Sequence, residues 1–404
     1  MLGWILATLA FSALHYGVWN PPLYHGSAVR VPGESTLKLA DNVIQLTILP
    51  AWAFAWRVLG RFQDLPTTMF ANALGWGIWT VVLYSMVRTL HRLASSGVAR
   101  VSEPAQNVAD PARRRFITGM ASGLAGGIPA GTLAQGTLVN PWSLEVARYK
   151  VPIHGLPDSM RGLRLVQISD THLGPRIPRD HIRRAVELTR RLLPDLVLLT
   201  GDYIHMGSWY IRPAAELFEP LVSASTPRLG VVAVMGNHDH YGDARQMTNE
   251  LARIGVRVLN NDRTFVSWDA SGLTDDAAAG GLCIAGVDDL LEGEVDHDAA
   301  LAGVLSHTPR IMLAHNPDTS ELLAGLPVAP RVDLMVSGHT HGGQIAIPGY
   351  GPPVVPSRYG RRFARGLVQT SLCPMVVSAG VGMSIMPVRI GVPPEIVEIT
   401  LVPQ

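Results

Sequence analysis

Between residues 168 and 344, five short blocks of aspartate, asparagine and histidine each come directly after a short apolar run. The side chains of interest in these blocks are Asp170, His172, Asp202, Asn237, His238, Asp239, His315, His339 and His341. Short apolar runs bounded by turn residues are typical of buried strands. Because open α/β sheets bind ligands at the carboxyl ends of parallel strands, the pattern predicts an α/β fold in which the blocks meet at one site.

The donor atoms in the blocks indicate which ions the site would hold. Apart from His238 and Asp239, they comprise two carboxylates, one amide and four imidazoles, with no thiol. Such ligands suit hard or borderline divalent metals, and one shared carboxylate allows two ions roughly 3.5–4 Å apart, as in two-metal phosphoester chemistry. A lone loop histidine is more often a surface or capping residue, but that explanation would have to hold at every position. We therefore expect two divalent ions, Mn, Fe or Zn.

The order of the blocks resembles the motif series of the calcineurin-like metallophosphoesterases. That series runs D-x-H, G-D, G-N-H-[DE], a lone H and then G-H-x-H, and all five motifs occur here in order. The run Gly338-His-Thr-His-Gly-Gly-Gln344 and the later Pro387-Val-Arg389 are similar to a membrane-associated bacterial subgroup often described as UDP-2,3-diacylglucosamine pyrophosphatase-like. The resemblance covers residues 161–402, which is more than half of the chain.

The resemblance implies two sets of metal ligands. Their members are Asp170, His172 and His341 in one set, and Asn237, His315 and His339 in the other. Asp202 would bridge the two ions, because a carboxylate has two oxygens. His339 and His341 are two residues apart, so on an extended segment both would point to one side and Thr340 to the other. The spacing of Asp170 and His172 leads to the same expectation.

His238 has no place in either ligand set. The resemblance makes it the acid that protonates the leaving oxygen, or a donor to a phosphate oxygen. Asp239 comes next in the sequence and would orient and charge the His238 ring, as in other carboxylate–imidazole pairs.

The first part of the chain is much more apolar than an ordinary soluble enzyme. Only 16% of all residues are charged and the mean hydropathy is +0.20, and the apolar excess lies in four stretches, roughly 2–19, 40–60, 69–90 and 116–138. Buried core helices are the alternative to membrane helices, but a soluble domain rarely needs four in succession. We expect a transmembrane region over residues 1–140 and a catalytic domain over residues 141–404.

Positive charge before the fourth stretch predicts the topology. The run Arg113-Arg-Arg115 with Phe116 and Ile117 resembles a twin-arginine export signal inside the chain. A plain positive-inside anchor is the alternative. Both place these arginines in the cytoplasm. We therefore expect a multi-pass protein of the cytoplasmic (inner) membrane with its catalytic domain on the outer or periplasmic side.

Strand-like and helix-like runs alternate at the start of the catalytic domain. Strands are predicted at 163–169, 196–200 and 230–235, and helices at 180–193, 212–222 and 243–254. After residue 255 strands dominate, at 256–259, 282–287, 310–314, 332–336, 375–378 and 396–401. The family resemblance implies a four-layer α/β/β/α sandwich with two mixed sheets.

Charge and cysteine content restrict the partners. Residues 141–404 carry 23 Lys/Arg and 27 Asp/Glu, so the domain lacks the basic signature of a nucleic-acid binder. Four arginines in the segment 348–365 would meet a phosphate or anionic lipid headgroups, or they would only satisfy local carbonyls. Cys283 and Cys373 are predicted to be buried free thiols.

The resulting hypothesis is a membrane-anchored phosphoesterase that acts on a phosphodiester, pyrophosphate or phosphomonoester. A lipid-linked substrate from phospholipid or lipid A metabolism would follow from tethering to the bilayer and from the resemblance. One alternative is a membrane transport or sensor protein whose phosphoesterase domain is regulatory. Another is a catalytically inactive binding domain, against which the complete ligand set argues.

Overall fold

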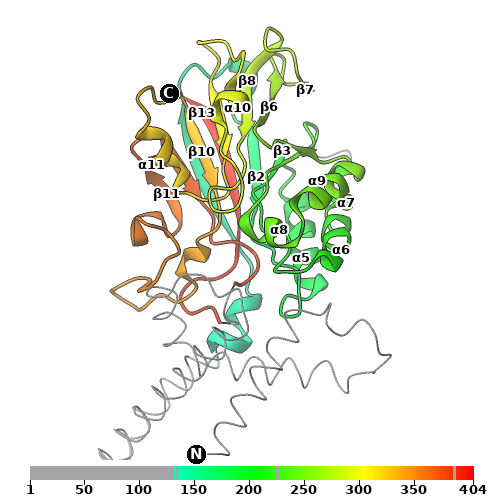
Figure 1. The fold of residues 1–404 in the computed structure, drawn as a ribbon, viewed down its shortest axis with the longest axis vertical. Coiled ribbons are helices and arrows are strands. Elements are labelled where there is room, and N and C mark those ends of the chain that lie inside the picture. Colours follow the sequence, from blue (N-terminus) through cyan, green and yellow to red (C-terminus); the bar gives the residue numbers. More distant parts are fainter. Residues whose placement is uncertain (1–131, 133–134, 224–226, 385–387) are drawn as a thin grey trace, which may run out of the picture. The chain divides into compact units, whose positions relative to one another are not determined.

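The computed structural model describes residue 132 and residues 135–223, 227–384 and 388–404. These residues lie in one compact unit, Thr132–Gln404. Two β-sheets form its centre (Figure 1).

The first sheet has six strands in the order β1-β13-β2-β3-β4-β5. Their bounds are β1 (Glu145–Ile153), β13 (Glu395–Pro403), β2 (Arg164–Ile168), β3 (Leu196–Leu199), β4 (Val231–Ala233) and β5 (Arg257–Val258). Strands β2 to β5 run parallel, while β13 is antiparallel to β2 and parallel to β1. The sheet is therefore mixed, with its parallel part formed by the strands that precede the first three polar blocks.

The second sheet has seven strands in the order β11-β12-β10-β9-β8-β6-β7. Their bounds are β11 (Gly366–Gln369), β12 (Pro374–Val377), β10 (Leu334–Ser337), β9 (Arg310–Leu313), β8 (Gly280–Gly286), β6 (Asp262–Ser267) and β7 (Leu273–Thr274). Strands β8, β9, β10 and β12 run parallel, and β6, β7 and β11 add antiparallel edges. This sheet carries the last two polar blocks.

The two sheets pack face to face through apolar side chains. Leu165 and Leu198 of the first sheet share one buried cluster with Leu282, Ile311 and Leu334 of the second. These leucines and isoleucines are fully buried, and burial of each such side chain contributes roughly 1.5–3 kcal/mol. The cluster fixes the two sheets as adjacent layers.

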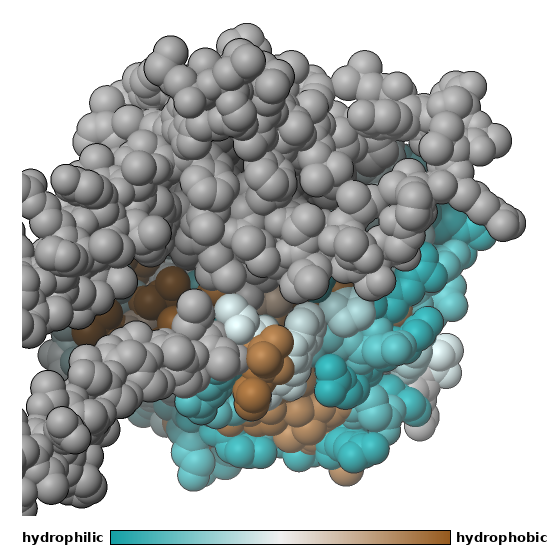
Figure 2. All heavy atoms as spheres, turned by 90° about the horizontal axis from the view of Figure 1, so that it is seen from below, coloured by the Kyte–Doolittle hydropathy of each residue, from teal (hydrophilic) through white to brown (hydrophobic). Residues whose placement is uncertain are grey.

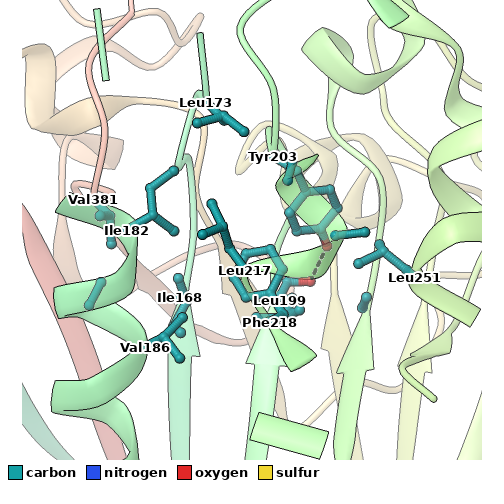
Figure 3. Packing of buried hydrophobic residues seen from close by; sticks show 14 of the residues in the cluster. Ile168, Leu173, Ile182, Val186, Leu199, Tyr203, Leu217, Phe218, Leu251 and Val381 are labelled. Atoms are coloured by element: carbon teal, nitrogen blue, oxygen red, sulfur yellow. Dashed lines mark hydrogen bonds between the residues drawn. The ribbon is translucent and has the colours of Figure 1, made fainter. Parts of the chain in front are cut away.

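Helices cover the outer faces of both sheets. The α-helices are α5 (Arg179–Arg191), α6 (Ile211–Glu216), α7 (Glu219–Val222), α8 (Asn237–Gly242), α9 (Ala244–Arg253), α10 (His297–Leu301) and α11 (Thr319–Ala324). Short 3₁₀ turns are η3 (Asn140–Trp142), η4 (Asp158–Met160), η5 (Ser208–Tyr210), η6 (His341–Gly343) and η7 (Gly360–Phe363). On the first sheet, Ile182 and Val186 of α5 pack beside Ile168 (Figure 3). On the second sheet, Ala300 of α10 and Leu323 of α11 pack against Met312 and Met335.

These layers confirm the predicted α/β fold with two mixed sheets. One predicted helix is wrong in detail, because residues 212–222 form two helices, α6 and α7. Pro220 lacks an N–H and its ring clashes with the carbonyl of residue 216 in a continuous helix, so α6 ends at Glu216 and α7 begins at Glu219. Strands β1, β6, β7 and β11 were not predicted.

The four apolar stretches and the run Arg113–Arg115 lie outside the described residues, except for the end of the fourth stretch. There, residues 135–138 are helical. No helix in the described part of the chain has the length and apolar character needed to cross a bilayer. The transmembrane region therefore stays a prediction.

Candidate metal centre

All five polar blocks occupy loops at the carboxyl ends of parallel strands. Asp170 and His172 follow β2, Asp202 follows β3 and Asn237 follows β4, where it begins α8. The second sheet supplies the remaining blocks: His315 follows β9, and His339 and His341 follow β10. Because the two sheets are packed together, these ends form one site. The structure thus brings all seven predicted ligands together.

Asp170, His172 and His341 form the first group of donors. Oδ1 of Asp170 lies 4.0 Å from Nε2 of His172 and 3.5 Å from Nε2 of His341. All three side chains are buried. The group matches the first predicted ligand set.

His315, His339 and Asn237 form the second group. Nδ1 of His339 lies 3.0 Å from Oδ1 of Asn237 and 3.3 Å from Nε2 of His315. Asn237 and His315 are buried, and His339 is partly buried. The group matches the second predicted ligand set.

Asp202 lies between the two groups. Its Oδ2 is 3.5 Å from Nε2 of His172 in the first group and 3.2 Å from Nε2 of His315 in the second. Gly236 lies against this carboxylate, since a Cβ at that position would overlap Oδ1 of Asp202. The position of Asp202 is the one that a bridging ligand requires.

The backbone that presents these ligands is not extended, and this part of the sequence analysis was wrong. Asp170, His172, His339 and His341 all have positive φ values, between 46 and 69°, and His341 begins the 3₁₀ turn η6. Such conformations are uncommon for residues other than glycine. The ligands converge because the strand exits turn sharply, whereas strand alternation plays no part. Thr340 does point elsewhere, because its hydroxyl donates to the Ala364 carbonyl at 2.6 Å.

Burial holds three of the imidazoles in their neutral form. It lowers the pKa of His172 and of His341 well below the usual value. It also lowers the pKa of His339, to about 3. A neutral imidazole is the form that binds a metal, so these three rings are in the ligand state over the whole physiological range.

The two carboxylates differ in their charge state. Burial raises the pKa of Asp170 to about 7. Burial acts in the same direction on Asp202, but the neighbouring His315 outweighs it and holds the pKa of Asp202 well below its usual value. In turn, burial would lower the pKa of His315, but the Asp202 carboxylate raises it well above the usual value. A negative charge is therefore concentrated on the residue shared by both groups.

Two observations indicate that the donor set fits a pair of cations. Nε2 of His172 faces Nε2 of His341 at 2.9 Å, so the two nitrogens are close enough to share a proton or to bind one ion. Nδ1 of His315 donates to the Thr200 carbonyl at 2.7 Å, which directs Nε2 towards Asp202. Ligand histidines commonly donate their other N–H to a carbonyl in this way. The residues present therefore fit two divalent ions.

His238 lies beside the ligands with its ring partly exposed. Its backbone N–H donates to Oδ1 of Asp202 at 2.8 Å, and its ring stands edge-on to the His172 ring, 4.6 Å between centroids. Nδ1 of His238 donates to the His205 carbonyl oxygen.

Asp239 does not have the partner that the sequence predicted. Instead of orienting the His238 ring, its buried carboxylate accepts hydrogen bonds from the backbone N–H groups of Asp202, Tyr203 and Gly236, at 2.8, 2.9 and 2.9 Å. The reason is geometric: Asp239 lies in the first turn of α8 and reaches back to the β3 and β4 exits. Asp239 holds the two loops together, and the His205 carbonyl orients His238.

Arg389 lies beside the candidate ligands, a position that was not predicted from the sequence. Its side chain is fully buried and donates to the carbonyls of Ala379, Gly380 and Gly382. Its guanidinium also lies 3.4 Å from Nδ1 of His341. The sequence signals are the run Pro387-Val-Arg389, noted above for its resemblance, and the position of a single arginine inside an apolar run.

Other titratable residues lie outside the two predicted ligand sets. His240 donates to Asp288 at 2.8 Å, and His181 contacts the Val381 carbonyl at 2.9 Å. Cys283 and Cys373 are buried free thiols, as predicted, and burial raises the pKa of each to about 12. His205 lies close to His172 and His238, in agreement with its closeness in sequence to the second block.

Comparisons with known proteins are consistent with this site. Residues 163–343 match the family described as calcineurin-like phosphoesterase. The uncharacterised metallophosphoesterase YkuE of Bacillus subtilis is 30% identical over 293 residues, covering 72% of this chain and 97% of that protein. The phosphodiesterase YaeI of Escherichia coli is 28% identical and covers 72% and 99% of the two chains. A Danio rerio protein named transmembrane protein with metallophosphoesterase domain is 34% identical and covers 64% and 57%.

Proposed function

Because the chain belongs to the calcineurin-like metallophosphoesterase family, we propose that it hydrolyses a phosphodiester or pyrophosphate bond of a lipid-linked substrate at a membrane surface. That it is a metal-dependent phosphoesterase follows from the family. A phosphomonoester is the third substrate class that this chemistry allows. The observation that carries the proposal is the convergence of seven donor side chains, with Asp202 between the other six.

Each ligand group would hold one divalent ion. Asp170, His172 and His341 would bind the first, and the second group, with Asn237 as its oxygen donor, would bind the other. Two bound divalent ions supply an activated water and neutralise charge on the phosphoryl oxygens. Asp202 would be shared by the two ions, since its Oδ2 lies between the two groups, and the neighbouring His315 favours the ionised form of this carboxylate by lowering its pKa.

His238 would give a proton to the leaving oxygen. The His205 carbonyl occupies Nδ1, so the proton would leave from Nε2. The hydrogen bond from the His238 backbone to Asp202 fixes the distance between this acid and the ligands. A positioned acid of this kind typically contributes 10²–10⁴-fold in rate.

The membrane part of the proposal rests on the sequence and on the names of relatives. The apolar stretches before residue 140 are long enough to span a bilayer, and the Danio rerio relative is named a transmembrane protein. We propose that the domain is tethered on the outer side of the cytoplasmic membrane. Tethering raises the effective concentration of lipid-linked phosphates there. A relationship to the UDP-2,3-diacylglucosamine pyrophosphatase-like subgroup belongs to this proposal.

A substrate panel tests the proposed function. Full-length protein in detergent, loaded with Mn²⁺, would be assayed against bis(p-nitrophenyl) phosphate, p-nitrophenyl phosphate and a lipid pyrophosphate in mixed micelles. We expect kcat/KM to be highest for the lipid pyrophosphate and lowest for the monoester. A clear preference for the soluble monoester would contradict the proposed substrate class. The same ranking in protein carrying Asp202→Ala would reveal a contaminating enzyme.

A further inference from the structure

The segment 345–365, which follows the last ligand block, exposes apolar side chains to solvent. Ile347, Tyr350, Val354 and Tyr359 are 49, 56, 61 and 42% exposed. One exposed apolar residue is ordinary on a protein surface, but several within one segment indicate an interaction site. Two of the four are tyrosines, which favour the level of lipid headgroups in membranes.

The same segment is strongly basic. It contains four arginines and no aspartate or glutamate. Arg362 pairs with Glu321 at 3.3 Å and Arg365 with Glu395 at 3.7 Å. Among the described residues, neither Arg358 nor Arg361 has a carboxylate within ion-pairing distance. Two positive charges on the segment are therefore left without an acidic partner in the described part of the domain.

The exposed arginines lie among the exposed aromatic side chains. The Arg361 guanidinium lies 4.4 Å from the centre of the Tyr350 ring and also donates to the Tyr350 carbonyl at 2.5 Å. Arg358 is adjacent to Tyr359 in sequence, and both are exposed. An arrangement of cations beside tyrosines is chemically complementary to a layer of phosphate headgroups above acyl chains.

The segment is fastened to the metal centre. The Ser357 hydroxyl and the Arg358 backbone N–H donate to the two oxygens of Asp318, at 2.5 and 2.8 Å. Asp318 belongs to the same block as the expected ligand His315, three residues earlier in the sequence. A surface that binds this segment would therefore lie next to the site.

The segment also adjoins the point where the chain enters the domain. The Arg389 backbone N–H donates to the Gly136 carbonyl at 2.9 Å, Ile390 donates to Gln344 at 2.9 Å, and Ala346 donates back to Ile390 at 2.7 Å. Residues 136, 389–390 and 344–346 are thus neighbours. The fourth apolar stretch of the sequence, 116–138, ends here, and its last residue, Leu138, is 72% exposed.

The figures agree with this placement. In Figure 1 the cyan start of the described domain and the orange part of the chain lie at the same lower end, away from the C-terminus. Figure 2 views that end, and brown hydrophobic residues are exposed beside teal hydrophilic ones where grey atoms do not cover the surface.

From these contacts we propose that residues 345–365 form a docking surface for an anionic lipid bilayer. The occupant is the headgroup layer of the membrane: Arg358 and Arg361 contact lipid phosphates, and Ile347, Tyr350 and Val354 enter the interface. Docking holds the metal centre at headgroup level. The inference deepens the proposed function, because it assigns the surface by which a lipid-linked substrate is reached.

The test uses a fluorescent label on this surface. Cys283 and Cys373 are the only cysteines in the sequence, and both are buried, so a cysteine introduced by Val354→Cys can be labelled selectively with an environment-sensitive fluorophore. Labelled full-length protein is reconstituted into vesicles of phosphatidylcholine alone or of equimolar phosphatidylcholine and phosphatidylglycerol. Emission should shift to the blue in the anionic vesicles only, and high salt should reverse the shift.

Two further variants control the experiment. Val328 is 83% exposed and precedes β10, whose opposite end carries the site, so label on Val328→Cys should not shift in either vesicle. The double change Arg358→Glu and Arg361→Glu in the Val354→Cys protein should remove the shift, since each arginine near an anionic surface contributes about five-fold to binding. The milder pair Arg358→Gln and Arg361→Gln should weaken it, and thermal melting checks that all variants fold.

Several outcomes would overturn the proposal. They are an absent shift, an equal shift in both kinds of vesicle, and an equal shift at position 328. A shift that grows with protein concentration without lipid would mean that a second copy of the chain covers the surface. The fluorescence does not depend on catalysis, so lack of hydrolysis by the same preparation would count against the proposed function and leave docking standing.

Discussion

The backbone N–H of His238 donates to Oδ1 of Asp202 at 2.8 Å, while the other oxygen of the same carboxylate lies between the two ligand groups. Asp202 thus links the expected proton donor to the expected metal ligands. Any change at Asp202 should affect metal binding and acid catalysis together, whereas a change at His238 should affect only the second.

We predict that Asp202→Ala loses almost all activity and that active wild-type protein holds two divalent ions. The substitution removes the charge shared by both groups and the acceptor for His238. Asp202→Asn keeps a hydrogen-bond acceptor but not the charge. It should therefore fold nearly as stably as wild type while binding less metal. Elemental analysis measures the number of bound ions per chain, and a turnover assay on the same preparation measures the activity. Full activity with fewer than two ions per chain would contradict the prediction.

We expect His238→Ala to keep both ions and to lose roughly 10²–10⁴-fold in turnover. The loss should be larger for an alkyl phosphodiester than for a nitrophenyl ester, because nitrophenolate leaves without protonation. His154→Ala, at an exposed position after β1, is the matched control and should change neither quantity. Metal loss in His238→Ala, or equal losses for the two substrates, would assign His238 another role.

Asp239→Ala should destabilise the protein by roughly 3–5 kcal/mol, because three buried N–H groups lose their acceptor. Asp239→Asn should fall between wild type and alanine, since an amide retains one acceptor oxygen. Thermal melting measures the effect. If Asp239 acted mainly by charging His238, the melting temperature would stay unchanged while kcat fell.

The His240–Asp288 pair predicts a pH-dependent contribution to stability. The hydrogen bond that His240 donates to Asp288 raises the pKa of His240 above 6.5. Burial opposes ionisation of Asp288, but its bond with His240 still lowers its pKa below 3.8. The histidine part of the contribution is complete below pH 6.5 and is lost as pH rises through the raised pKa of His240. The aspartate part is present above pH 3.8 and is lost as pH falls through the lowered pKa of Asp288.

His240→Gln should therefore lower the melting temperature at about pH 5.5 and have a much smaller effect at about pH 8.5. Because the pair is partly exposed, the difference should stay below about 1 kcal/mol. Asp288→Asn should show the same trend. An equal effect of His240→Gln at both pH values would show that the charge of His240 does not contribute.

Reporter fusions test the proposed location. The cluster Arg113–Arg115 should stay in the cytoplasm, so a single further crossing places the catalytic domain outside. Alkaline phosphatase should be active when fused after Gln404 and inactive after Arg100. A fluorescent protein that matures only in the cytoplasm should show the reverse. The opposite pattern would place the site inside and direct the substrate search to soluble nucleotides.

The sequence by itself determined which seven side chains are the candidate ligands and where strands and helices alternate around them. The resemblance implied the ligand sets, and their convergence was predictable because each residue follows a buried strand and the exits of parallel strands lie at one edge of a sheet. The donor atoms then restricted the kind of ion, because oxygen and imidazole ligands favour hard or borderline divalent metals. Strands such as β2 and β3 were predictable because short apolar runs bounded by turn residues are typical of buried strands.

Only the tertiary structure decided which groups contact one another across the blocks. Asp239 was expected beside His238 because the two are adjacent in sequence, yet its oxygens bond to N–H groups 36 and 37 residues away. Arg389 lies against His341 although 48 residues separate them. The positive φ values of the ligands arise in the same way, because packed sheets compensate a local strain that no isolated segment would adopt. Contacts between distant segments depend on how strands pair within a sheet and on how the two sheets meet, and both are properties of the whole domain.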